Sequence, residues 1–498
     1  MSASVVLTAS QIQQVEQEAF ERGVEAAALM EQAGAGIARV VQQFFPTLGT
    51  CVVYCGKGHN GGDALVAARY LATCGWKALV RLAFPKDAMA LLSQSHLEEL
   101  LENYHALCVE EISENMGQSL VLLDGLLGIG AQGAPQEPLT LLIEEMNDLR
   151  RDRGAFTVGV DLPSGLDATT GIPAASCVQA DLTVTIGFAK TGLLADTATN
   201  HVGRLALVPL SDLKTSEGQE ASLITSATLR SLLPPRSFEV HKGIFGHVGI
   251  IAGSRGTLGA ARLASAGALH AGAGLVTLYA LPEIYELLAT SCAPEVMVKP
   301  ITCYSEVLSE PLTALAIGPG LGSEHHLDIL EVIEKATIPC VVDADALNAL
   351  AKEMPLLLKC QGPRLLTPHP GEMERLFPKV GRDRATWASN FVERYPVTLL
   401  LKGSRTIVAE QGEPLAYNTT GNPGMASGGM GDVLSGVAAA FLAGGHMPRE
   451  AAMLGAWLCG RAAESAIYEG TASEESLVAS DVIAHLGRAT KRLRAGSF

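Results

Sequence analysis

NPGMASGGMGDVLSG, residues 422–436, gathers several glycines ahead of one acid, Asp432, and an apolar run follows that acid. Glycines let peptide N–H groups approach an anion closely, and a helix start carries about half a positive charge. This order of residues therefore predicts a glycine-rich loop that leads into a helix and binds an anion through its backbone N–H groups. An aspartate in that place is suited to take a proton from a hydroxyl about to meet a phosphoryl group. The alternative is a glycine-rich turn with Asp432 as its N-cap, and the motif is not a Walker sequence.

Composition limits the classes of protein that the chain can belong to. A chain of 498 residues is too long to fold around a single hydrophobic core, so we predict two or three domains. A hydrophobic fraction of 48% with 18% charged residues is typical of a well-packed α/β enzyme. A net charge of −16 argues against nucleic acid or an anionic membrane as partner. Local donors must therefore hold any anionic ligand.

The N-terminus and the cysteines predict a cytoplasmic protein. The first twenty residues have neither the basic region nor the apolar core of a signal peptide, and no apolar run reaches membrane-spanning length. The ten cysteines are scattered, without a C-x-x-C pair or a zinc-type spacing. We interpret them as reduced, mostly buried thiols.

The polar run SDLKTSEGQEAS, residues 211–222, is the best candidate for a linker. Strand-like runs alternate with helical runs on both sides of it. We therefore predict one α/β domain over 1–212 and a second over 223–498.

Polar, glycine-rich loops follow three strand-like runs of the first domain. Asn60 and Asp63 lie in a predicted strand-to-helix turn after 51–54, and Asp124 follows 119–123. Asp161 follows 157–160, with Ser164 three residues later. The carboxyl ends of parallel strands lie along one edge of a sheet, so a shared site is predicted in preference to three separate caps. For Asn60 and Asp63, turn-forming hydrogen bonds are the alternative.

The residue types in this predicted site favour a cation. Clustered carboxylates need a proton or a cation, and oxygen ligands without His or Cys indicate a hard one. Asp161 is also placed to move a proton on a substrate. Lys190 follows the next strand-like run, 182–186, and we expect it to be an exposed surface lysine, with a position facing the site as the alternative.

The second domain repeats this logic with other residues. The run 248–252 predicts a strand, followed by a glycine loop and a small-residue helix over 260–271. His369 stands between two prolines after another strand, where a rigidly held titratable group or a surface histidine fits equally. The turn that begins at Lys402 carries groups suited to a nucleotide phosphate or base edge.

Taken together, the motifs carry a resemblance to a known family. They are HNGGDA, LLDGLLGIGAQG, VDLPSGLDATTG, AGSRGTLGAA, AIGPGLG, VVDADALN, TPHPGEM, LKGSRTIV and SGGMGDVLSG. Over nearly all of both domains the chain resembles the bifunctional NAD(P)H-hydrate repair enzymes. The N-terminal half is similar to the NAD(P)HX epimerases, and the C-terminal half to the ADP/ATP-dependent NAD(P)HX dehydratases. One departure is that His59 and Ala64 flank NGGD, where the family's usual turn is closer to NNGGDG.

The resemblance implies an α/β fold with an N-terminal Rossmann-like three-layer sandwich and a C-terminal ribokinase-like domain. It implies K⁺ on Asn60, Asp124 and Ser164, and catalysis by Asp161 and Asp432. In the epimerase domain the hydrated dinucleotide would contact Asp161 and Asn60, Gly61, Gly62, Asp63, Ala64, Gly128, Ile129, Gly130, Ala131, Gln132, Gly133 and Ala134. In the dehydratase domain it would contact Ala260, Gly320, His369 and Asp432. The nucleotide, ADP with Mg²⁺, would contact Lys402, Gly403, Ser404, Arg405, Thr406 and Gly431.

The implied function is repair of hydrated NADH and NADPH by an isomerase joined to a lyase, in a homo-oligomer. The first domain would interconvert the R and S hydrates, and the second would dehydrate the S form with ADP, giving AMP and phosphate through a phosphorylated intermediate. The alternative is a ribokinase-like small-molecule kinase fused to a nucleotide-binding module. The residues leave open the choice between ADP and ATP and between the two hydrates.

Overall fold

The structure, a computed structural model, describes residues 4–113, 119–131, 133–215, 220–378 and 383–498. The chain divides into two compact units, Met1–Leu223 with Phe498 and Ile224–Ser497. Residues 216–219 of the predicted linker lie outside the described residues. The extent of each functional domain stays a prediction.

The first unit is built on a parallel sheet in the order β4-β3-β2-β5-β6-β7-β9. Its strands are β2 (Thr50–Cys55), β3 (Lys77–Leu82), β4 (Leu107–Cys108), β5 (Leu120–Gly125), β6 (Phe156–Val160), β7 (Leu182–Ile186) and β9 (Arg204–Val208). The central strands are continuous apolar runs, as burial on both faces requires. In the register, Asp124 lies opposite Tyr54 and Gly159, so the carboxyl ends of β2, β5 and β6 meet at one edge.

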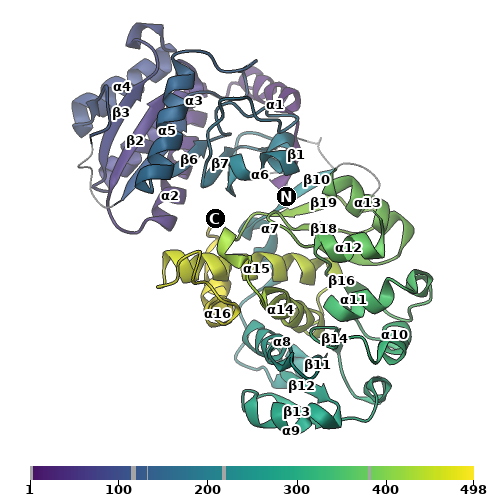
Figure 1. The fold of residues 1–498 in the computed structure, drawn as a ribbon. Helices are drawn as coiled ribbons and strands as arrows, with labels where there is room; N and C mark the ends of the chain where they lie inside the picture. The colour runs from purple at the N-terminus through teal and green to yellow at the C-terminus, as the bar shows by residue number, and fades with distance from the viewer. Residues whose placement is uncertain (1–3, 114–118, 132, 216–219, 379–382) are drawn as a thin grey trace. The chain divides into compact units, whose positions relative to one another are not determined.

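Helices cover both faces of this sheet (Figure 1). They are α2 (Ala26–Phe44), α3 (His59–Thr73), α4 (Leu91–Tyr104), α5 (Leu139–Arg153) and the short α6 (Thr199–Val202). The α5 side chains Ile143 and Met146 pack on Val52 and Leu122, whereas α2, α3 and α4 pack in sequence on the other face. The predicted three-layer arrangement is therefore confirmed.

The N-terminal segment adds a small second sheet to this unit. Strand β1 (Val6–Leu7) pairs in parallel with β8 (Ala189–Lys190), with Leu7 opposite Lys190. Helix α1 (Ala9–Glu21) follows, capped by the hydroxyl of Thr8, as predicted. Phe20 is 41% exposed, because it lies one residue beyond the buried 3–4 spacing of Ile12, Val15 and Ala19.

The second unit contains a ten-stranded sheet in the order β10-β19-β18-β17-β16-β15-β14-β11-β12-β13, antiparallel only at β17-β18 and β18-β19 among the strand pairs with a described register. The strands are β10 (Ala221–Ile224), β11 (His247–Ile251), β12 (Leu275–Ala280), β13 (Met297–Pro300), β14 (Ala314–Ile317), β15 (Cys340–Val342), β16 (Arg364–Leu366), β17 (Thr398–Leu401), β18 (Ile407–Ala409) and β19 (Leu415–Asn418). The strand predicted over 248–252 is confirmed with a shift of one residue.

Figure 1 shows α8, α14, α15 and α16 on one side of these strands and α10 to α13 on the other. The helices are α7 (Ser226–Leu229), α8 (Leu258–Ala271), α9 (Pro282–Ser291), α10 (His326–Lys335), α11 (Ala344–Leu350), α12 (Pro370–Leu376), α13 (Arg384–Arg394), α14 (Met430–Ala443), α15 (Pro448–Tyr468) and α16 (Ala479–Ala495). Among the described residues, no helix combines the length and apolarity that a membrane crossing requires.

Small residues let α8 and α14 cross closely, and this crossing positions the start of α14. A Cβ on Gly436 would lie 1.9 Å from the carbonyl oxygen of Ala264, and one on Gly267 would lie 2.6 Å from that of Val433. Backbone therefore meets backbone at both glycines, and neither position has room for a side chain.

We expect Gly436→Ala to lower the free energy of unfolding of the second unit by about 1–3 kcal/mol, because the added methyl forces the helices apart. Denaturant titration measures the loss. Gly487→Ala is the matched control, since that helical glycine has no atom within 4 Å of its added Cβ, and we expect a gain of about 0.5–1 kcal/mol. Equal stability of Gly436→Ala and the unsubstituted protein would contradict the close crossing.

Candidate functional site

Asp124 is the buried centre of the first site. It lies inside β5, is fully buried, and its carboxylate accepts hydrogen bonds from the backbone N–H (2.7 Å) and hydroxyl (2.6 Å) of Ser164. Leu126 N–H donates a third at 3.3 Å. Burial raises the pKa of Asp124 to about 6, although these hydrogen bonds lower it in part. No ion pair to Asp124 occurs among the described residues, so within that part of the chain its charge has no cationic partner.

Asn60 joins Asp124 and Ser164 through the backbone of Leu127. The Asn60 amide donates to the Leu127 carbonyl (2.8 Å), and the Leu127 N–H donates to the Ser164 hydroxyl oxygen (2.9 Å). The predicted convergence of these three side chains is therefore confirmed. Their oxygen donors beside an unbalanced carboxylate fit a hard cation such as K⁺.

The turn predicted over 56–62 is wrong in its second half, because α3 already begins at His59. Asn60 and Asp63 thus lie in the first turn of a helix. Glycine is needed at 61 for packing, since a Cβ there would lie 2.7 Å from the Gly56 carbonyl oxygen, whereas a Cβ at 62 would lie 2.6 Å from the flexible end of the Met30 side chain.

Of the described residues in the second candidate loop, 128–134, Gly128 lies closest to the network of Asn60, Asp124 and Ser164. A Cβ on Gly128 would lie 3.2 Å from the Asn60 side chain. Ile129 is half-buried, while Gly130, Ala131, Gly133 and Ala134 are exposed. Gln132 lies outside the described residues.

Asp161 pairs with a buried lysine. The expectation that Lys190 is exposed is wrong: its side chain is 1% exposed and forms an ion pair with Asp161 Oδ1. The physical reason is the β1–β8 pairing, a contact between distant segments that covers Lys190. Asp161 has φ +69°, an uncommon left-handed conformation for a residue other than glycine.

Two more carboxylates share this neighbourhood. Burial and the charge of Asp161 raise the pKa of Asp63 well above its ordinary value, and Lys190 opposes the rise. Burial raises the pKa of Glu16 on α1, again with Asp161 adding to the rise and Lys190 opposing it. Sequence reasoning missed Glu16, and its place in the buried stripe of α1, between Ile12 and Ala19, is the only signal that pointed inward.

In the second unit, the predicted loop-to-helix arrangement at Asp432 is confirmed. Gly429, with φ +89°, is the N-cap of α14, and Asp432 lies in the first turn. The alternative of Asp432 as N-cap is therefore wrong. Burial raises the pKa of Asp432 to about 6, the neighbouring Asp343 raises it further, and Lys402 opposes them. A carboxylate poised in this range is suited to general-base catalysis.

Lys402 and Asp343 form a network beside Asp432. Lys402 Nζ donates to Asp343 Oδ1 at 2.8 Å and lies 3.7 Å from Glu372. Ser435, one turn along α14 from Asp432, donates to Asp343 Oδ2 at 2.6 Å. Burial lowers the pKa of Lys402, but Asp343 and Glu372 outweigh it and the net pKa is raised. Sequence reasoning noted Asp343 at a strand end and missed its link to Lys402.

Gly431 lies beside the Lys402–Asp343 network, whereas the residues of the turn after Lys402 differ in their exposure. A Cβ on Gly431 would lie 3.3 Å from Lys402 Nζ. In the turn after Lys402, Gly403 and Ser404 are exposed and Thr406 is half-buried. Arg405, expected at a phosphate or base, is 3% exposed.

The remaining substrate candidates fall into two places. Gly320 has φ +65°, and a Cβ there would lie 3.0 Å from that of Ala260, so these two residues are in contact. His369 is the N-cap of α12: its Nδ1 accepts from Gly371 N–H at 3.0 Å, and its side chain is 52% exposed. Glu372 links this cap to Lys402.

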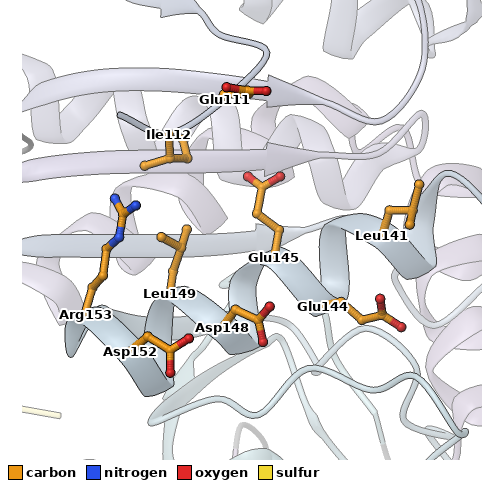
Figure 2. A pocket seen from close by; sticks show the side chains of 9 residues that line it. All are labelled: Glu111, Ile112, Leu141, Glu144, Glu145, Asp148, Leu149, Asp152 and Arg153. Atoms are coloured by element: carbon orange, nitrogen blue, oxygen red, sulfur yellow. The ribbon is translucent and has the colours of Figure 1, made fainter. Parts of the chain in front are cut away.

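A hollow between α5 and the segment that carries Glu111 and Ile112 contains none of the predicted site residues (Figure 2). It is lined by Glu111, Ile112, Leu141, Glu144, Glu145, Asp148, Leu149, Asp152 and Arg153. Its carboxylates repel an anionic dinucleotide, so we place the site at the strand ends.

Comparison with known proteins matches a separate family model to each half of the chain. A family model described as YjeF-related protein N-terminus matches residues 26–192, and one described as NAD(P)H-hydrate dehydratase matches residues 248–485. The bifunctional NAD(P)H-hydrate repair enzyme of Moorella thermoacetica is 35% identical, over 96% of this chain and 95% of the relative. That of Escherichia coli is also 35% identical, over 96% and 93%.

The chain belongs to the bifunctional NAD(P)H-hydrate repair enzymes. Each family model falls within one compact unit. The predicted fold class, a Rossmann-like sandwich followed by a ribokinase-like α/β domain, is confirmed. The ADP/ATP-dependent NAD(P)H-hydrate dehydratase of Bacillus subtilis, co-crystallised with ATP and Mg²⁺, is 31% identical, covering 54% of this chain and 98% of its own, with a TM-score of 0.49.

Proposed function

We propose that this member of the NAD(P)H-hydrate repair enzymes interconverts the R and S hydrates of NADH and NADPH in its first unit and dehydrates the S form in its second. The observation that carries the proposal is that family membership extends over both units, and each unit contains its own candidate catalytic aspartate. Asp161 lies at the strand ends of the first unit, and Asp432 at the helix start of the second.

In the dehydratase unit, Asp432 takes the proton of the ring hydroxyl, and the hydroxyl oxygen attacks the terminal phosphoryl group of ADP. AMP leaves, and a phosphate ester replaces the hydroxyl. Hydroxide is a poor leaving group, whereas phosphate departs readily with the electron pair of the C–O bond. The neighbouring ring carbon then gives up a proton to the departing phosphate, and the electrons of that C–H bond restore the ring double bond. Lys402 and the N–H groups at the start of α14 stabilise the negative charge that develops on the phosphoryl oxygens.

Mg²⁺ with the nucleotide neutralises phosphate charge. Among the described residues no group of three or more His, Cys, Asp or Glu side chains is arranged to hold a metal, and a Mg²⁺ that arrives with the nucleotide would be held in part by its phosphates. We propose ADP as the donor, and the residues of the site fit ATP as well.

In the epimerase unit, K⁺ fits the oxygens of Asn60, Asp124 and Ser164, where it balances the buried carboxylate. Asp161 moves the proton that opens and recloses the hydrate ring, so that R becomes S. The two units together then salvage both epimers. A cytoplasmic homo-oligomer, predicted from the sequence, completes the proposal.

The decisive experiment incubates the purified chain with mixed R and S hydrates and either ADP or ATP. We expect both epimers to be consumed, with one phosphate released for each reduced dinucleotide that regains its near-ultraviolet absorbance. The alternative, a kinase joined to a binding module, predicts a stable phosphorylated product and no gain in absorbance. If the R hydrate remained unconsumed, the chain would lack the proposed epimerase activity.

The pH dependence of dehydration tests the network around Asp432. We expect Asp343→Asn to lower the pKa of Asp432, because after burial the Asp343 charge is the strongest influence that raises it. Asp432 must be ionised to act as a base, so the acid limb of kcat/KM for the S hydrate moves to lower pH. Asp345→Asn is the control, since Asp345 raises the same pKa more weakly. A limb that stays fixed or moves upward would contradict this role for Asp343.

A further inference from the structure

Lys190 is held by three acceptors, which matches the number of N–H donors on its ammonium group. It pairs with Asp161 Oδ1, donates to the Thr185 hydroxyl at 3.2 Å and to the Ile186 carbonyl at 3.1 Å. A buried ammonium with every donor engaged is fixed in place. It has no donor left for a substrate, so any effect on the reaction must pass through Asp161.

These contacts also orient the Asp161 carboxylate. Ile186 N–H donates to Asp161 Oδ1 at 3.0 Å, the same oxygen that Lys190 contacts. The described hydrogen bonds to this side chain therefore all fall on Oδ1, and the side chain keeps 13% exposure. Oδ2 accepts no hydrogen bond from the described residues, which leaves it as the oxygen available to a substrate.

The charge balance around Asp161 depends on Lys190. The charged groups that interact with one another here are Glu16 from α1, Asp63 from α3, Asp161 itself and Lys190 from β8. Three carboxylates thus share one ammonium group. Without that ammonium the pKa of Glu16 and that of Asp63 would rise further, because Lys190 opposes the rise in both.

We infer that Lys190 is a positioning residue for epimerisation: it holds the Asp161 carboxylate turned so that Oδ2 faces the hydrate. The inference rests on the epimerase activity proposed above. Asp161 Oδ2 takes the proton of the hydroxyl group on the hydrated ring carbon. The bond between this carbon and the ring nitrogen then breaks, and its electron pair stays on the nitrogen. Asp161 returns the proton to that nitrogen. The open form is an aldehyde. Rotation presents its other face, and the same steps reversed close the ring as the other epimer.

The test compares Lys190→Met with the unsubstituted full-length chain on hydrate enriched in the R epimer. We expect kcat for epimer exchange to fall about 100-fold, KM to change little, and the acid limb of kcat/KM to move up by about 1–3 pH units. Dehydration of pure S hydrate, measured on the same sample, stays unchanged and reports on the integrity of the second unit.

Two further variants separate a charge effect from simple loss of packing. Lys190→Gln keeps N–H donors on a side chain one bond shorter and removes the charge, so we expect the same upward shift in pH. Adding Glu16→Gln to Lys190→Met removes one competing carboxylate, and we expect the limb to move back toward its original position. A loss of kcat without a pH shift, or without this recovery, would overturn the inference. Absence of exchange in the unsubstituted protein would instead overturn the epimerase assignment.

Discussion

Asp432→Asn is expected to abolish the restoration of reduced dinucleotide while epimer exchange continues at its original rate. The amide has the size of the carboxylate but cannot accept the hydroxyl proton, so we expect dehydration to fall by about 1,000-fold or more. Asp432 lies in the first turn of α14, with Lys402 and Asp343 beside it, and no other group on that turn can replace the base. Nucleotide-dependent phosphate release and the gain in absorbance measure the loss.

Epimer exchange in the same Asp432→Asn sample is the control for folding. Asp161 and Lys190 belong to the first unit, whereas Asp432 belongs to the second. If both activities fell together, the assignment of one reaction to each unit would be wrong.

Asp161→Asn is expected to have the opposite effect. The amide cannot accept a proton at the oxygen that faces the substrate, and it loses the ion pair to Lys190, so we expect exchange to fall by at least about 100-fold. Dehydration of the S hydrate continues, and a mixture of hydrates is consumed only as far as its S fraction. Chromatographic separation of the epimers over time measures the R remainder.

Consumption of the R hydrate at the original rate by Asp161→Asn would favour the alternative of a non-catalytic nucleotide-binding module. It would also remove the basis for a positioning role of Lys190. Restored consumption on adding a separately purified Asp432→Asn sample would instead support the assignment, because the two variants supply complementary activities.

The sequence predicts those parts of the sites that depend on local chain chemistry. A run of glycines before Asp432 predicts a helix start, because only glycine adopts the φ of +89° found at Gly429 without strain. Apolar strands followed by Asp124 and Asp161 predict a shared edge, since parallel strands align their carboxyl ends. Both predictions are confirmed.

The sequence does not predict the parts that depend on contacts between distant segments. Lys190 is buried because β1, far away in the chain, pairs beside it, and Glu16 approaches Asp161 because α1 follows that strand. No periodicity near either residue reports this pairing. The start of α3 is missed for a different reason: glycines at 61 and 62 suggest a turn, but here they allow close helix packing.

The fate of the hydroxyl oxygen tests whether Asp432 primes the hydrate for phosphorylation. S hydrate labelled at that oxygen with the heavy isotope is incubated with ADP and the Asp161→Asn variant, which cannot open the ring and exchange the label. Mass spectrometry then follows the released phosphate. We predict that each phosphate carries the label, because the oxygen attacks the phosphoryl group before it leaves. Unlabelled phosphate, with the label recovered in water, would contradict a phosphorylated intermediate and the role given to Asp432.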